Sequence, residues 1–146
     1  MVTLSARLAA IVDALPLREG MRVLEIGGAP GAAARAVSQR IGNGHILVID
    51  RSAKGTALVE AHAAEEIAAG RLRVRCVAAE DFALVPGEEP FDLAFAVRVG
   101  ALDGRHPKAG VRARQRIAAA LTPEGRLFVD GGTPLREVDL TDARRA

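Results

Sequence analysis

The sequence has very few aromatic residues. They make up 3% of its 146 residues, and Trp and Tyr do not occur at all. Proteins that bind single-stranded nucleic acid stack the bases on such rings, so this scarcity argues against a surface of that kind. We therefore expect a core of Ala, Val, Leu and Ile. Hydrophobic residues make up 49% of the chain and charged residues 26%, which is typical of a globular protein.

Cysteine is nearly absent as well. Cys76 is the only one, so no disulfide can form within the chain, and its place in an alternating apolar run predicts a buried structural thiol. No cluster of His, Cys and acidic residues has the spacing of metal ligands, so no metal is expected. The net charge of +2 is too small to indicate a nucleic-acid partner. No stretch resembles a signal peptide or a membrane span, and we expect a cytoplasmic protein with no membrane partner.

The most informative segment is VLEIGGAPG, at residues 23–31, which an Ala-rich stretch follows. A short apolar run predicts a buried parallel strand, and the small residues after it predict a tight turn into a helix. This is the pattern of the first strand–turn–helix unit of a doubly wound nucleotide-binding fold. Small residues allow a ligand to approach the backbone, and the helix start offers it free N–H groups.

The details of the turn indicate which ligand fits. A dinucleotide-binding loop reads G-x-G-x-x-G, but Ala29 and Ala32 stand at two of those glycine positions, and Pro30 has no N–H to donate. Glu25 would repel a phosphate but could pair with an ammonium group. A ligand with an amine and a carboxylate therefore fits better than a dinucleotide.

The segment resembles the glycine-rich motif of class I S-adenosylmethionine-dependent methyltransferases, which usually reads E/D-x-G-x-G-x-G. Ala29 replaces the central glycine, and some members of that family carry a G-A-A-P-G turn there. The resemblance covers nearly the whole chain. It implies S-adenosylmethionine as cofactor and methyl transfer to a small-molecule acceptor by a single domain, residues 1–146.

The remaining pattern predicts an α/β, doubly wound (Rossmann-like) fold with a mainly parallel sheet of about five strands and helices on both faces. Helices are expected at 3–15, 31–40, 55–69 and 107–121, and strands at 22–26, 45–49, 72–77, 91–97 and 126–130. Members of the family usually continue with an antiparallel strand pair, which this chain is expected to lack. Leu127, Phe128 and Val129 would then form an open sheet edge, to be covered either by the tail or by a second chain in a homodimer.

Ten residues are assigned to the cofactor. They are Glu25, Gly27, Gly28, Ala29, Gly31, Asp50, Arg51, Glu80, Asp81 and Val97. An acid at the end of the second strand, Asp50, meets the ribose in such folds, although Asp is also a favoured helix cap. The resemblance places an acid after the third strand beside the adenine, and we assign Glu80 to this role; the alternative for Asp81 is a cap of a short helical turn. It also places Glu25 near the methionine amine.

Catalytic residues are less evident. Val97 offers only backbone and apolar contacts, and the N-P-P-Y and D-P-P-Y motifs of some methyltransferases are absent. His106 is the one candidate for a general base, the alternative being a surface histidine before Pro107. Two other functions stay open at this point: a non-catalytic S-adenosylmethionine-binding or interaction module, and an NADP-dependent oxidoreductase that would use Arg51 for the 2′-phosphate.

Overall fold

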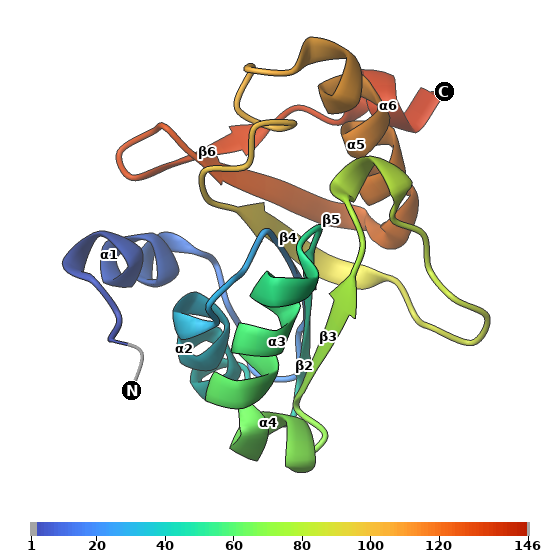
Figure 1. The fold of residues 1–146 in the computed structure, drawn as a ribbon. Coiled ribbons are helices and arrows are strands. Elements are labelled where there is room, and N and C mark those ends of the chain that lie inside the picture. Colours follow the sequence, from blue (N-terminus) through green and yellow to red (C-terminus); the bar gives the residue numbers. More distant parts are fainter. Residues whose placement is uncertain (1–2, 146) are drawn as a thin grey trace.

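A six-stranded sheet lies between two layers of helices in the structure, a computed structural model that describes residues 3–145 (Figure 1). The strand order is β3-β2-β1-β4-β5-β6, and only β5 and β6 are antiparallel. The strands are β1 (Arg22–Ile26), β2 (His45–Asp50), β3 (Leu72–Cys76), β4 (Phe91–Ala96), β5 (Leu121–Asp130) and β6 (Leu135–Val138). The helices are α1 (Ala6–Ala14), α2 (Ala32–Arg40), α3 (Ala53–His62), α4 (Ala64–Ala68), α5 (Pro107–Ala120) and α6 (Thr141–Arg145), with a 3₁₀ turn η1 (Ala79–Asp81).

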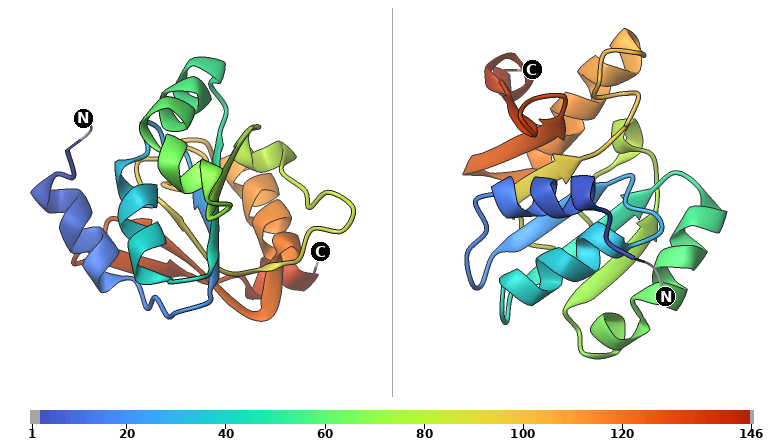
Figure 2. Two further views of the ribbon diagram at one scale, coloured as in Figure 1. Left: turned by 90° about the horizontal axis from the view of Figure 1, so that it is seen from below. Right: turned by 90° about the vertical axis from the view of Figure 1, so that its left-hand side faces the viewer.

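Helices cover both faces of the sheet, which confirms the doubly wound fold. Helices α1 to α4 pack on one face, and α5, α6 and η1 pack on the other; Figure 2 shows the two layers from further directions. Side chains alternate along β1, so Val23 packs in the core under α1 to α4, and Leu24 packs in the core under α5, α6 and η1. The prediction of a purely aliphatic core is wrong, because all four phenylalanines are buried: Phe82, Phe91, Phe95 and Phe128.

The C-terminal segment corrects the prediction of a missing antiparallel pair. Strand β6 pairs antiparallel with β5, from Leu127 opposite Val138 to Asp130 opposite Leu135. Leu140 follows and is buried in the core on the α5 face. The tail therefore covers the edge of β5, and the open edge that favoured a homodimer does not exist.

Three local predictions also differ from the structure. The helix expected at 55–69 begins at Ala53, is capped by Ser52 and breaks into α3 and α4 at Ala63. The turn expected before residue 126 belongs to β5, which starts at Leu121 and pairs with β4 through a register shift. Cys76 is exposed, because it lies at the end of the edge strand β3.

Among the helices of residues 3–145, none combines the length and the apolar character needed to cross a membrane.

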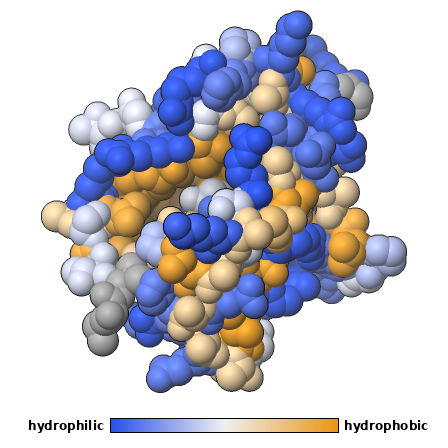
Figure 3. Space-filling model, in the orientation of Figure 1, coloured by the Kyte–Doolittle hydropathy of each residue, from blue (hydrophilic) through white to orange (hydrophobic). Residues whose placement is uncertain are grey.

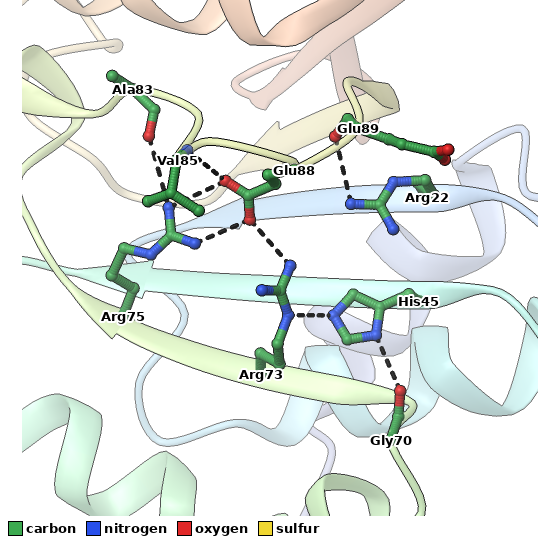
Figure 4. Close-up of polar contacts among 9 residues, drawn as sticks. All are labelled: Arg22, His45, Gly70, Arg73, Arg75, Ala83, Val85, Glu88 and Glu89. Carbon is green, nitrogen blue, oxygen red and sulfur yellow. Dashed lines mark hydrogen bonds and ion pairs between the residues drawn. The ribbon is translucent and has the colours of Figure 1, made fainter.

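A buried carboxylate ties the loop between η1 and β4 to the sheet (Figure 4). The Glu88 side chain is 2% exposed and accepts hydrogen bonds from Arg73 and Arg75, both at 2.8 Å, and from the Val85 N–H at 3.1 Å. Arg73 in turn donates from Nε to Nε2 of His45 at 2.8 Å. Burial alone would raise the pKa of the Glu88 carboxyl, but the hydrogen bonds from Arg75, Val85 and Arg73 hold this pKa at about 2.

We expect the Glu88→Gln variant to lose about 2 kcal/mol of unfolding free energy at pH 7, because two charge-assisted hydrogen bonds from Arg73 and Arg75 to its side chain weaken. The contribution of Glu88 is complete above about pH 4.5 and is lost as the pH falls toward about 2. Urea unfolding at neutral and acidic pH measures both effects. Glu60 is exposed, so Glu60→Gln is the control, and an equal loss in both variants would contradict the prediction.

Candidate functional site

The candidate site lies at the carboxyl ends of the parallel strands. Strand β1 is central, with β2 on one side and β4 on the other, and the chain leaves β1 and β4 toward opposite faces of the sheet. Open α/β sheets bind ligands at such a reversal of strand order. Two clefts meet at this position, and only Gly27 and Arg98 line both of them.

The first cleft has a volume of about 490 Å³ and opens between the ends of β1, β2 and β4 and the start of α5. Asp50 and Glu80 bring carboxylates to its wall, and Ile26, Ile49 and Val77 bring apolar surface. Such a mixture of apolar walls and a few polar groups is typical of small-molecule sites of this size.

The second cleft, of about 440 Å³, lies on the other side of the loop that follows β1. Its walls come from the start of α1, from residues 27–30, from the start of α2 and from Val97 and Arg98. Figure 3 shows this face hollowed beside α1, with hydrophobic residues in the hollow and hydrophilic ones along its edge. The two clefts together can hold an elongated ligand that passes Gly27.

Close packing explains the glycines of the loop. Gly27 has a φ of 69° and Gly31 a φ of 108°, which L-residues with side chains rarely adopt. A Cβ on Gly28 would lie 2.6 Å from Cγ1 of Val48 and 2.8 Å from the carboxyl carbon of Glu25. The loop therefore rests directly on the side chains of β1 and β2, which fixes its backbone at the junction of the clefts.

Asp50 connects this loop with the start of α3. Its Oδ2 accepts from the Ala29 N–H at 3.3 Å, and its Oδ1 accepts from the Ser52 N–H at 3.0 Å. Each carboxylate oxygen has a second lone pair, so Asp50 can still accept hydrogen bonds from a ligand in the first cleft. The helix cap of α3 is Ser52, so the alternative that Asp50 is that cap is wrong.

Glu25 is a buried acid without a partner. It is 4% exposed, and within residues 3–145 its Oε1 has no hydrogen-bond partner. Burial, and next the negative charge of Asp50, raise the pKa of Glu25 to about 8, so the carboxyl is neutral at pH 7. Since Glu25 also lines the second cleft, it is placed to meet a positively charged ligand group there.

The structure brings most of the predicted site residues together. Eight of the ten line a cleft: Gly27, Asp50, Arg51 and Glu80 line the first, and Glu25, Gly27, Gly28, Ala29 and Val97 the second. Gly31 and Asp81 line neither. Gly31 begins α2 and packs against Val59, and Asp81 lies 3.5 Å from Arg112 on the surface. His106 lines the first cleft at the start of α5 and is exposed.

Three arginines at the clefts were not predicted. Arg7 and Arg105 lie far from the glycine-rich motif in sequence, and no pattern around them distinguishes them from the other arginines. Arg98 lies two residues after the end of β4, where the fold brings it to both clefts, and no role was predicted for it. Among residues 3–145, no three His, Cys, Asp or Glu side chains gather in a way that could hold a metal ion.

Comparisons with known proteins agree with this geometry. A protein-L-isoaspartate O-methyltransferase from Methylorubrum extorquens (strain PA1) is 37% identical over 137 residues, which are 94% of this chain and 53% of that protein. The chain thus spans about half the length of this curated relative. An S-adenosylmethionine-dependent methyltransferase from Thiobacillus denitrificans, solved with S-adenosylhomocysteine, is 24% identical, with a TM-score of 0.65 over 84% of this chain and 46% of that chain.

A phosphoethanolamine N-methyltransferase from Haemonchus contortus, solved with phosphoethanolamine and S-adenosylhomocysteine, shares the fold. Its TM-score is 0.72 at 15% identity, over 86% of this chain and 25% of that chain. The family model described as a methyltransferase domain matches residues 23–125, which include most of β1, all of β2 to β4, the glycine-rich loop and both acids of the first cleft. The chain therefore belongs to the methyltransferase domain family, in agreement with its resemblance to class I S-adenosylmethionine-dependent methyltransferases.

Proposed function

We propose that the chain binds S-adenosylmethionine and transfers its methyl group to a small-molecule acceptor. The observation that carries the proposal is the pair of clefts that meet at Gly27, with carboxylates in one and the buried Glu25 in the other. Asp50 would accept hydrogen bonds from the ribose, and Glu80 from the adenine amino group. Glu25, by giving up its proton, would pair with the ammonium of the methionine group.

The residues of the site suit this cofactor. A ligand with an ammonium group would satisfy the unpartnered oxygen of Glu25, whereas the 2′-phosphate of NADP would lie beside Asp50, which would repel it. When bound, S-adenosylmethionine supplies a methyl group on a positively charged sulfur, already activated for transfer. The chain then has mainly to position the acceptor and exclude water, and needs no strong base.

The acceptor is the part of the function that the site defines least. The M. extorquens relative is named for action on isoaspartate, so an isoaspartyl peptide is the first acceptor to test. Transfer of a labelled methyl group to it, or to a panel of small molecules, distinguishes an enzyme from a non-catalytic binding module. The cytoplasmic location and the single domain of residues 1–146 stay predictions. The homodimer has lost the open edge of β5 on which its prediction rested.

We expect the Asp50→Ala variant to bind S-adenosylhomocysteine about 10- to 100-fold more weakly, because it loses hydrogen bonds to a charged group worth about 1–3 kcal/mol. Isothermal calorimetry measures the affinity, and thermal unfolding shows whether the variant is folded. Asp81→Ala is the control, since Asp81 is an exposed acid that lines neither cleft. Unchanged affinity in Asp50→Ala, or tighter binding of NADP by the wild type, would overturn the proposal.

A further inference from the structure

Arg98 lies where the two clefts meet. It follows the end of β4 by two residues and, with Gly27, lines both clefts. In the proposed function the donor contacts residues 27–29, which line the second cleft together with Arg98. Arg98 is therefore placed beside the donor, at the junction with the first cleft.

The backbone of Arg98 is held in a strained conformation. Its φ is 58°, and it is the only residue other than glycine with a positive φ in the described part of the chain. Asp130 holds the Arg98 N–H at 3.0 Å, and Nη2 of Arg105 donates to the Arg98 carbonyl at 3.3 Å. Arginine is unfavourable in this conformation, where glycine would fit without strain. Strain that neighbours maintain in this way is common at functional sites.

The guanidinium of Arg98 has no protein partner within residues 3–145. Asp130 binds Arg7 at 2.8 Å and Asp103 binds Arg105 at 2.8 Å. Asp50 and Glu80 also line the first cleft, but within the described residues neither forms an ion pair with Arg98. Glu25, which also lines the second cleft, is assigned to the ammonium group of the cofactor in the proposed function. The junction therefore presents one free guanidinium, with a planar set of donors that matches a carboxylate or a phosphate.

We infer that Arg98 binds the oxyanion, a carboxylate or a phosphate, of an anionic small-molecule acceptor and so selects the substrate class. The inference rests on the proposed function, since it assigns the acceptor side of that site. Arg98 is in this view a specificity residue. An arginine with this strained backbone would have no advantage over glycine if the position were only structural.

The test uses benzoate and phenyl phosphate as probes, with benzamide as the neutral analogue, on protein saturated with S-adenosylhomocysteine. We expect Arg98→Gln to weaken binding of one or both anions about tenfold or more, the ratio that corresponds to ~1.4 kcal/mol. Arg98→Lys should retain part of the affinity, and benzamide binding should not change. If Arg98→Gln weakens binding of benzoate alone, the acceptor group is assigned as a carboxylate. If it weakens binding of phenyl phosphate alone, the acceptor group is assigned as a phosphate.

Two further variants separate binding from folding. Arg116, on the exposed side of α5, is the control, and Arg116→Gln should leave both anions unaffected. Arg98→Gly should lose anion binding while its melting temperature rises by a few degrees, because the strain is relieved.

Three outcomes would overturn the inference. The first is no anion binding by the wild type, and the second is anion binding by Arg98→Gln equal to that of the wild type. The third is a loss of S-adenosylhomocysteine affinity in Arg98→Gln as large as its loss of anion affinity, which would assign Arg98 to the donor's carboxylate. Failure of the wild type to bind S-adenosylhomocysteine is a different result, because it overturns the proposed function itself.

Discussion

As the pH rises, the wild-type protein should lose roughly 3–5 kcal/mol of unfolding free energy that the Glu25→Gln variant keeps. The pKa of Glu25 is about 8 in the folded protein because of burial and the charge of Asp50, against 4.5 in the unfolded chain. Between these pH values the unfolded chain has released the proton and the folded protein retains it. The stabilisation by protonated Glu25 is therefore complete below about pH 4.5. It decreases as the pH rises and stops decreasing above about pH 8.

Urea unfolding of both proteins across this pH range measures the difference. Glu66 provides a matched control, because it is also 4% exposed but accepts a hydrogen bond from Nε of Arg35 at 3.0 Å. Glu66→Gln should lose about 1–3 kcal/mol at pH 7, since it breaks a partly buried ion pair with Arg35. Parallel pH curves for the wild type and Glu25→Gln would show that Glu25 ionises normally in the folded protein.

Glu25 and Asp50 also show how far the sequence predicts the site. The apolar run around Glu25 and the small residues after it were sufficient to predict β1, the loop and α2, because periodicity and turn residues are local signals. They did not predict the ionisation of Glu25, which depends on its burial in the fold and on the charge of Asp50 from the next strand. Asp50 was correctly placed at a strand end, but its contacts with Ala29 and Ser52 come from the folded loop.

Non-local contacts explain the remaining errors. Strand β6 is short and carries Arg136 and Glu137, so its alternation is too weak to predict a strand, and its pairing with β5 is what orders it. Cys76 lies in an apolar alternating run, but exposure depends on the sheet order, which puts β3 at the edge. The strained φ of Arg98 has no sequence signal, since arginine does not favour that conformation.

A methyl group on Gly28 should disturb both the fold and the site. The added Cβ would lie 2.6 Å from Cγ1 of Val48 and 2.8 Å from the Glu25 carboxyl, and both side chains are buried on central strands. The loop must move, because the strands cannot. We expect Gly28→Ala to lose about 1–3 kcal/mol of unfolding free energy by overpacking. Its affinity for S-adenosylhomocysteine should fall by about 10- to 100-fold, ~1.4–2.8 kcal/mol.

A double variant tests whether the contact with Val48 is the cause. Val48→Ala alone should cost about 2 kcal/mol through lost burial, but in Gly28→Ala/Val48→Ala the new methyl group occupies the space that the valine leaves. The loss in the double variant should then be smaller than the sum of the single losses by about 1 kcal/mol or more. Strictly additive losses would contradict this steric explanation. If the double variant regains stability but not ligand binding, the remaining contact with Glu25 is responsible, because that carboxyl stays displaced from the second cleft.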